Sequence, residues 1–159
     1  MKSRVYIETS VVGYYAGRGS RDTVIAGHQQ STLGFWRLPG SELSPSVSAL
    51  VVKEAGKGDP EVAKGRLDAI HAFPVLRTTD EAEQLAQAIL DARAVPAEYP
   101  EDAPHIAVAA IAGMDFIVTW NFAHINNPFT KMMIRHAVEN VGYECPEIVS
   151  PDAFLGDQT

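Results

Sequence analysis

Short apolar runs alternate along this chain with longer stretches in which apolar residues recur at helical spacing. The short runs predict five strands, at residues 5–7, 43–47, 73–76, 116–119 and 148–149. Apolar residues three and four positions apart predict helices at residues 21–38, 49–55, 60–71, about 80–90, 101–112 and 128–142. A shorter helix-like run, residues 11–15, directly follows the first strand. Strands alternating with helices indicate an α/β fold with a parallel sheet and helices on both of its faces.

Capping residues and prolines mark the boundaries of these elements. The predicted helix starts carry a capping residue or a capping box, sometimes with proline next to it, at Ser20 or Asp22, Ser48, Asp59-Pro60, Thr78 or Asp80, and Asn127-Pro128. Pro39-Gly40 ends the helix of residues 21–38. Pro45 argues against the second strand, and Pro74 indicates either an edge strand or a strand start for the third.

Length and composition fit one soluble globular domain that spans residues 1–159, with 46% hydrophobic and 21% charged residues. No apolar run is long enough to cross a membrane, and no signal peptide is recognisable at the N-terminus. Cys145 is the only cysteine, which excludes an intrachain disulfide and favours a cytoplasmic setting. A formal net charge of −7 argues against a protein that grips nucleic acid over its whole surface.

Polar side chains stand near the ends of the predicted strands. Glu8 follows the first strand, and Glu54 lies on the helix after the second. Glu101 and Asp102 open the helix before the fourth strand, and Asn121 follows that strand. Ligands of open α/β sheets bind beyond the carboxyl ends of the strands, so three carboxylates meeting there would form a cation site. Oxygen ligands favour Mg²⁺ or Mn²⁺, ions that promote displacement at a phosphodiester.

Each acid also has a structural interpretation. Asp102 lies in a first helical turn, where an acid caps the helix and complements its dipole. Glu54 lies between Lys53 and Lys57, which is typical of a solvated surface. Glu8 is the hardest to explain structurally, because glutamate is depleted in strands. Only the convergence of these acids would make a site.

Four segments carry these polar residues in a characteristic order. They read Val-Tyr-Ile-Glu-Thr-Ser-Val-Val at 5–12, Ser-Ala-Leu-Val-Val-Lys-Glu at 48–54, Glu-Asp-Ala-Pro-His-Ile-Ala-Val-Ala at 101–109 and Thr-Trp-Asn-Phe-Ala-His at 119–124. Together they resemble the PIN-domain family, metal-dependent ribonucleases that include the VapC-type toxins of bacterial toxin–antitoxin pairs. The first is similar to the family's acid-Thr-Ser opening strand, and the third to its Asp-Ala-x-His-Ile-Ala motif. The fourth stands where the family has Thr-x-Asp or Thr-x-Asn.

The resemblance implies a three-layer α/β/α sandwich with a mostly parallel, about five-stranded sheet. It also implies a metal-dependent endoribonuclease, the toxin of a toxin–antitoxin pair, that uses Mg²⁺ or Mn²⁺. The implied metal ligands are Glu8, Glu54 and Asp102, and Asn121 completes the implied catalytic set. Single-stranded or structured RNA, an antitoxin protein and a second copy in a homodimer are the implied partners.

Two positions depart from the family pattern. Glu8 stands where the family usually has aspartate, and its carboxylate reaches one methylene further. Asn121 is neutral, so it can offer an oxygen but cannot compensate the charge of a metal ion. These departures leave open a second function, a PIN module that binds metal or RNA without efficient cleavage. A nucleotide-binding or phospho-acceptor α/β protein is a third class, but the first turn lacks the glycine-rich loop and no partner lysine is found.

Neighbouring residues have auxiliary interpretations. Thr9 and Ser10 are expected either to help a metal site or to cap the following helix, and His105 to be packed or hydrogen-bonded beside Asp102. His124 is interpreted as a loop-shaping residue. Four basic residues are candidates for a phosphate-binding rim, although scattered basic residues are usually just solvated: Arg18, Arg21, Lys131 and Arg135. Met132 and Met133, inside the last predicted helix, are interpreted as core filling.

Overall fold

A computed structural model describes residues 2–38 and 42–156 of the chain. Its strands are β1 (Ser3–Ile7), β2 (Leu43–Ser48), β3 (Val75–Leu76), β4 (Phe116–Val118) and β5 (Glu147–Val149). Its helices are α1 (Thr9–Ala16), α2 (Thr23–Trp36), α3 (Ala49–Ala55), α4 (Pro60–Ile70), α5 (Asp80–Asp91), α6 (Asp102–Ile111), α7 (Pro128–Val141) and the 3₁₀ turn η1 (Pro151–Phe154). The helix end predicted at Pro39-Gly40 lies outside the described residues.

The strands form a five-stranded sheet in the order β3-β2-β1-β4-β5, in which every described pair is parallel. β1 is the central strand: Tyr6 lies opposite Ser46 of β2 on one side and Ile117 of β4 on the other. Residues Val5 to Ile7 are almost fully buried, as expected for a strand covered on both faces. This confirms the predicted sheet, which is parallel throughout.

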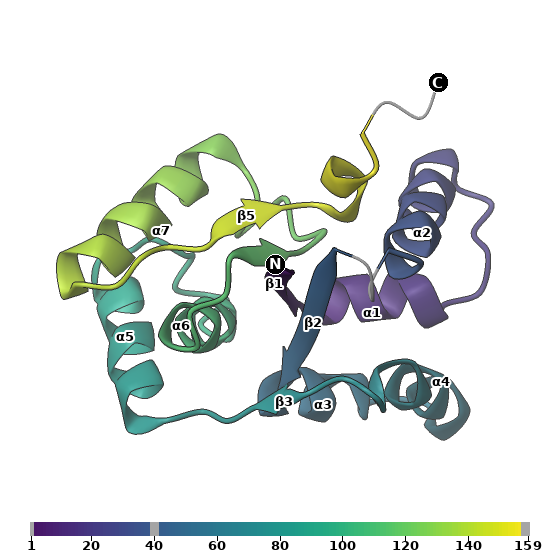
Figure 1. The fold of residues 1–159 in the computed structure, drawn as a ribbon, viewed down its shortest axis with the longest axis horizontal. Coiled ribbons are helices and arrows are strands. Elements are labelled where there is room, and N and C mark those ends of the chain that lie inside the picture. Colours follow the sequence, from purple (N-terminus) through teal and green to yellow (C-terminus); the bar gives the residue numbers. More distant parts are fainter. Residues whose placement is uncertain (1, 39–41, 157–159) are drawn as a thin grey trace.

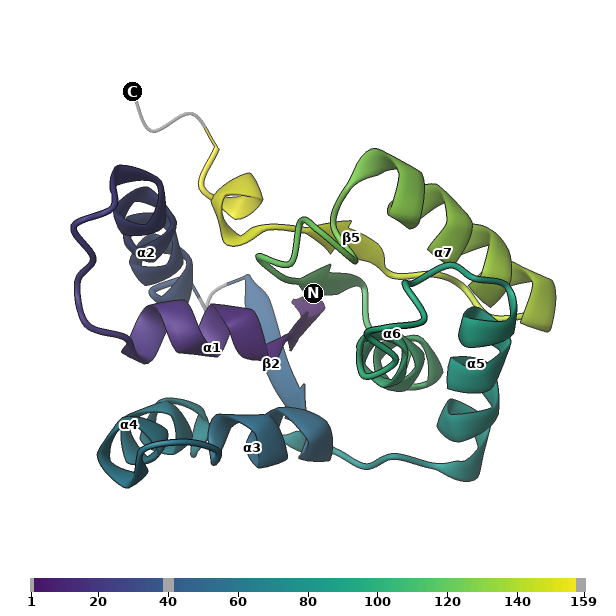
Figure 2. The same ribbon diagram turned by 180° about the vertical axis from the view of Figure 1, so that it is seen from behind.

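Helices cover both faces of the sheet. Figures 1 and 2 show α1 to α4 gathered on one side of the strands and α5 to α7 on the other. Within each group the helices contact one another, α1 packing on α2, α3 and α4, and α5 packing on α6 and α7. The hydrophobic core lies between these groups and the strands. The predicted α/β fold, a three-layer α/β/α sandwich, is therefore confirmed.

Side-chain caps fix several of the predicted helix starts. Asp22 accepts hydrogen bonds from the first turn of α2, Ser48 from the Val51 N–H of α3, and Asn127 from the first turn of α7. The predicted cap of α5 was wrong, because Thr79, rather than Thr78 or Asp80, accepts from the Ala82 N–H. Asp59 stands at the predicted start of α4, before Pro60, but its side chain accepts no cap hydrogen bond.

Pro45 lies inside β2, which has neighbours on both sides and is therefore not an edge strand. The register explains how the sheet accommodates this proline. β3 pairs only with Val47 and Ser48, so beside Pro45 the strand has a single neighbour, β1. A missing backbone N–H is tolerated where no second strand requires it. Because β3 is short, Pro45 is compatible with the position of β2 inside the sheet.

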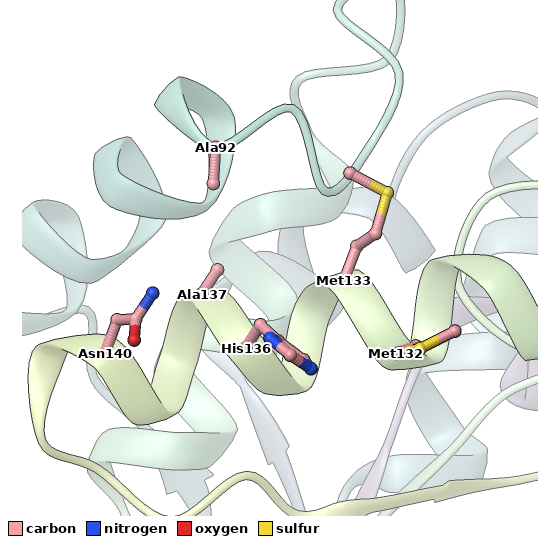
Figure 3. Close-up of a pocket in the computed structure, with 6 residues that line it drawn as sticks. All are labelled: Ala92, Met132, Met133, His136, Ala137 and Asn140. Carbon is pink, nitrogen blue, oxygen red and sulfur yellow. The ribbon is translucent and has the colours of Figure 1, made fainter.

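The interpretation of Met132 and Met133 as core filling was wrong. Their side chains are 57% and 45% exposed, and they line a shallow hollow between α7 and the end of α5 (Figure 3). α7 instead buries Ile134, Ala137 and Val138, which follow one helical face. Within the described ranges, no helix combines the length and the apolarity needed to cross a membrane.

Candidate metal centre and active site

Parallel topology brings the carboxyl ends of the strands to one edge of the sheet. Glu8 directly follows β1, and Thr119 directly follows β4. β2 ends at Ser48, from which α3 carries Glu54 in its last turn. α6 runs back toward the start of β4, so Asp102 in its first turn belongs to the same edge. Residues far apart in sequence are therefore assembled by the topology rather than by local spacing.

Glu8 is buried and held by two hydroxyl groups. Ser10 Oγ donates to Glu8 Oε1 over 2.5 Å, and Thr119 Oγ1 donates to the same oxygen over 2.7 Å. The backbone N–H of Trp120 donates in turn to Ser10 Oγ over 2.9 Å, which links this group to the end of β4. An ionised carboxylate accepts about four hydrogen bonds, so Glu8 keeps capacity for a cation.

Glu54 is held by a hydroxyl and an imidazole. Thr9 Oγ1 donates to Glu54 Oε1 over 2.5 Å, and His105 Nε2 lies 2.8 Å from the same oxygen. Burial alone would raise the pKa of Glu54, but the hydrogen bond and positive charge of His105, with the Thr9 bond and Lys57, lower it overall. Glu54 is therefore a carboxylate at neutral pH, although it stands at a helix C-terminus, where the dipole disfavours negative charge.

His105 connects this carboxylate to the core of the sheet. Its Nδ1 lies 2.6 Å from the hydroxyl of Tyr6, which lies 2.8 Å from Ser48 Oγ. Burial would lower the pKa of His105, yet the bond to Glu54 and the charges of the nearby acids raise it overall. The expectation of a packed, hydrogen-bonded His105 is confirmed.

Glu8, Glu54 and His105 form one cluster. Each offers a ligand atom, and these atoms all lie within 4.8 Å of one another. Two of the three predicted acids thus come together directly, and His105 is the third member of the cluster. Asp102, one helical turn before His105, lies outside this group of three but close enough for the charge of Glu8 to act on its carboxyl.

Asp102 is bonded to two side chains of the segment after β4. Asn121 Nδ2 donates to Asp102 Oδ1 over 3.3 Å, and His124 Nδ1 lies 3.1 Å from Asp102 Oδ2. Burial and then the charge of Glu8 raise the pKa of Asp102, against the opposing effect of His124. The oxygen of Asn121 accepts the backbone N–H of His124 over 3.0 Å. Asn121 therefore contacts Asp102, and both ends of its amide are engaged.

Sequence reasoning missed Tyr6, Thr119 and His124. The sequence predicts a loop-shaping role for His124, yet this residue contacts Asp102 directly. Tyr6 gave no signal, because a tyrosine inside an apolar strand is normal core material. Thr119 was read only as part of a strand end and a motif, although its hydroxyl binds Glu8. Both predicted auxiliary hydroxyls, Thr9 and Ser10, contact the acids.

Two of the four basic residues named as rim candidates, Arg18 and Arg135, lie in different regions. Arg18 lines a hollow of about 340 Å³ that begins at Ser10 and runs between α1 and α2. Arg135 instead lies 3.6 Å from Glu139 and 3.7 Å from Glu147, at the amino end of β5. Arg135 is therefore not part of a rim beside the crevice, because parallel strands put their amino ends at the opposite edge of the sheet.

The donor set fits a divalent cation. Glu8 and Glu54 present carboxylate oxygens to one another across the cluster, and both act electrostatically on the buried His105. A bound cation would offset the mutual repulsion of Glu8 and Asp102, which raises the pKa of Asp102 in its absence. Because His105 Nε2 is engaged with Glu54, oxygen atoms dominate the set, as Mg²⁺ and Mn²⁺ prefer.

Comparisons with known proteins find a similarity to this chain in its fold but not in its sequence. No protein-family model and no curated protein sequence matches it. Among solved structures, a chain of VapBC2 from Rickettsia felis, bound to a DNA fragment from their promoter, is similar with a TM-score of 0.53. The two chains share 13% identity over 76% of this chain and 89% of the other. The similarity establishes a common fold, which agrees with the PIN-like sandwich expected from the sequence.

Proposed function

We propose that this chain is a metal-dependent endoribonuclease of the PIN-domain type and the toxin of a toxin–antitoxin pair. The observation that carries the proposal is the gathering of Glu8, Glu54 and His105 within 4.8 Å, with Asp102 beside them, at the carboxyl edge of the sheet. Buried acids that repel one another are costly to a fold unless a cation or a function compensates for them. The fold shared with VapBC2 supports the same class.

Each polar residue has a role in this proposal. Glu8, Glu54 and Asp102 hold one Mg²⁺ or Mn²⁺ ion, and Asn121 orients Asp102. Thr9 and Ser10, together with the Thr119 hydroxyl, fix the carboxylates in place. When bound, the ion would supply positive charge that activates water for attack on a phosphodiester. His105 positions Glu54 rather than contacting the substrate.

The partners follow from the same proposal. The substrate is RNA, single-stranded or structured, and its cleavage takes place in the cytoplasm. Because the similar structure is a VapBC2 assembly, we propose an antitoxin protein as a partner. The family resemblance of the sequence is the ground for proposing a homodimer as the form of the toxin.

Asn121 favours a second candidate function, a PIN module that binds metal or RNA without efficient cleavage. Its amide is neutral and its oxygen is engaged by the N–H of His124, so it adds no charge for a second cation. A single ion lacks the partner that, in two-metal sites, stabilises the leaving oxygen. In this alternative the site binds but turns over very slowly.

One experiment separates the two functions. A fluorescent single-stranded RNA is incubated with the protein in Mn²⁺, in Mg²⁺ and in EDTA, and both cleavage and binding are measured. Asp102→Asn is the test variant, and Glu139→Gln, at an exposed pair on α7, is the matched control. Metal-dependent cleavage lost only in Asp102→Asn supports the ribonuclease. Binding without cleavage supports the second function, and absence of both contradicts each.

A further inference from the structure

Two large aromatic side chains are exposed beside the acidic site. Tyr99 is 45% exposed, and its carbonyl accepts the backbone N–H of Asp102 over 3.2 Å. Phe122 is 43% exposed and directly follows Asn121. Tyr99 therefore adjoins the proposed ligand Asp102, and Phe122 adjoins Asn121, which is hydrogen-bonded to Asp102. Exposed aromatic rings that adjoin a functional site need a partner to cover them more than scattered apolar residues do.

The ring of Tyr99 is held against the site by His124. The two rings are stacked, with centroids 4.0 Å apart and planes at 25°. His124 Nδ1 is the atom that contacts Asp102 Oδ2. One face of the Tyr99 ring is thus covered by an imidazole bonded to the acid, and the exposed part of the ring remains accessible to a flat ligand. This arrangement is preorganised, because the ring does not have to be ordered on binding.

The ring of Phe122 rests on a second aromatic group. Its centroid lies 5.8 Å from that of Trp120 and 5.9 Å from that of His28 on α2. His28 and Trp120 are themselves stacked 4.1 Å apart, and Trp120 Nε1 donates to Thr32 over 2.8 Å. Phe122 is therefore supported on its inner side by a rigid base. Phe122 thus packs against α2, whereas Tyr99 precedes α6, and α2 and α6 lie on opposite sides of β1 in Figures 1 and 2.

The net negative charge of the protein makes base stacking a more important source of affinity for a nucleic acid than contacts with its phosphates. A net charge of −7 repels a polyanion, and the proposed metal site neutralises only part of the local negative charge. Arg18, in the hollow that begins at Ser10, provides one cation near the site. A protein with few phosphate contacts can still bind single strands, because unpaired bases stack on aromatic rings whatever their sequence.

We propose that Tyr99 and Phe122 are stacking platforms for the unpaired bases of a single-stranded nucleic acid that crosses the acidic site. This inference rests on the proposed function and specifies its substrate as unpaired rather than duplex. Because Tyr99 is hydrogen-bonded to Asp102 and Phe122 directly follows its partner Asn121, bases stacked on either ring would bring the adjoining phosphodiesters to the acids. The chemistry is shared by RNA and DNA, since both offer flat bases.

Binding is measured in EDTA, where metal-dependent cleavage cannot occur, by fluorescence anisotropy of labelled single-stranded RNA, single-stranded DNA and duplex RNA. Tyr99→Ala and Phe122→Ala should each weaken binding of the single strands by roughly fivefold or more. Tyr99→Phe keeps a ring and should retain the affinity of the wild type. Val141→Ala is the control, because Val141 is 48% exposed at the end of α7, which leads to the amino end of β5 and so lies away from the site. Its affinity should not change.

The outcomes separate this inference from the proposed function. Loss of binding in both alanine variants supports the platforms even if no metal-dependent cleavage is found, in which case only the proposed function fails. Equal binding by the wild type and both alanine variants overturns the platforms while leaving cleavage untouched. Duplex RNA bound as tightly as the single strands would overturn them too. A difference between the affinities for single-stranded RNA and single-stranded DNA identifies which of the two the rings prefer.

Discussion

The hydroxyl of Tyr6 and Nδ1 of His105 lie 2.6 Å apart in the core, and this contact joins the central strand to the candidate site. The Tyr6 hydroxyl also lies 2.8 Å from Ser48 Oγ, the cap of α3, while His105 Nε2 lies 2.8 Å from Glu54. Burial raises the pKa of Tyr6 far above its usual value, so the hydroxyl stays neutral. A buried polar chain thus positions Glu54 from inside the sheet.

Replacing Tyr6 by phenylalanine tests this chain. The substitution keeps the ring volume and removes one oxygen, so His105 Nδ1 and Ser48 Oγ both lose a partner in a site without water access. Leaving buried polar groups unpaired costs about 1–3 kcal/mol. We expect the free energy of unfolding of Tyr6→Phe to fall by that amount, measured by urea denaturation.

The control is Tyr143→Phe, at a half-buried position in the separate hollow near Cys145. Its unfolding free energy should change by less than about 0.5 kcal/mol. Equal stability of Tyr6→Phe and the wild type would show that the hydroxyl contributes nothing to the fold.

A divalent cation should stabilise the protein. It would bind the native cluster, relieve the repulsion of Glu8 and Asp102, and find no such cluster in the unfolded chain. At about 100 times the dissociation constant, the gain is about 2.7 kcal/mol, or a rise in melting temperature of roughly 5–10 °C. Thermal unfolding in millimolar Mn²⁺, Mg²⁺ and EDTA measures this rise.

Asp102→Asn should reduce the same rise, because the variant lacks one proposed ligand. Glu139→Gln removes a charge of the same sign from an exposed pair and should keep the full rise. A wild-type protein whose melting temperature is the same in millimolar metal and in EDTA contradicts the metal site.

Patterns repeated along the chain were enough to predict the sheet and most helix starts. Apolar runs, and caps such as Asp22 and Asn127, act within a few residues. The strands and helix starts that they produce can therefore be predicted from the local sequence. Pro45 misled because its effect depends on the length of β3, a neighbour about 30 residues away. Local sequence therefore determines where the helices and strands lie, whereas the neighbouring strands determine whether a residue such as Pro45 is tolerated in the sheet.

The site was predictable only in part for a similar reason. Glu8 and Glu54 follow strand ends, which parallel topology brings together, so their convergence could be anticipated. Contacts of His124 depend on the irregular path of residues 119–127, for which no periodicity exists. Tyr6 has an ordinary core pattern, and only the position of His105 gives its hydroxyl a polar role.

Cys145 should react slowly with thiol reagents. Burial raises the pKa of its thiol to about 11, so the reactive thiolate is scarce at neutral pH. In the folded protein, the rate of modification by an aromatic disulfide should increase with pH up to about 11. At pH 8, the protein unfolded in guanidinium should react faster than the folded protein, because its thiol has the ordinary, lower pKa. Because the unfolded thiol ionises first, this group also lowers stability as pH rises from about 9 toward 11. Equal rates in folded and unfolded protein at pH 8 contradict the shift.

Asn121 donates from Nδ2 to Asp102 Oδ1 over 3.3 Å and accepts the His124 N–H on Oδ1. In Asn121→Asp the acceptor remains, but an oxygen replaces the donor that faces Asp102. Without metal, two carboxylates then repel each other, and we expect stability in EDTA to fall by about 1–3 kcal/mol.

In metal the same change should act in the opposite direction. The added negative charge should tighten Mn²⁺ binding about tenfold, or about 1.4 kcal/mol, and restore the stability lost in EDTA. If a missing second cation limits the reaction, RNA cleavage should also accelerate. Calorimetric titration with Mn²⁺ and cleavage rates compare wild type, Asn121→Asp and Asn140→Asp, which adds the same charge at an exposed position on α7. Mn²⁺ affinity that is unchanged or weaker in Asn121→Asp would place residue 121 beyond the reach of the ion. Faster cleavage without tighter metal binding would instead mean that the new carboxylate acts on the substrate.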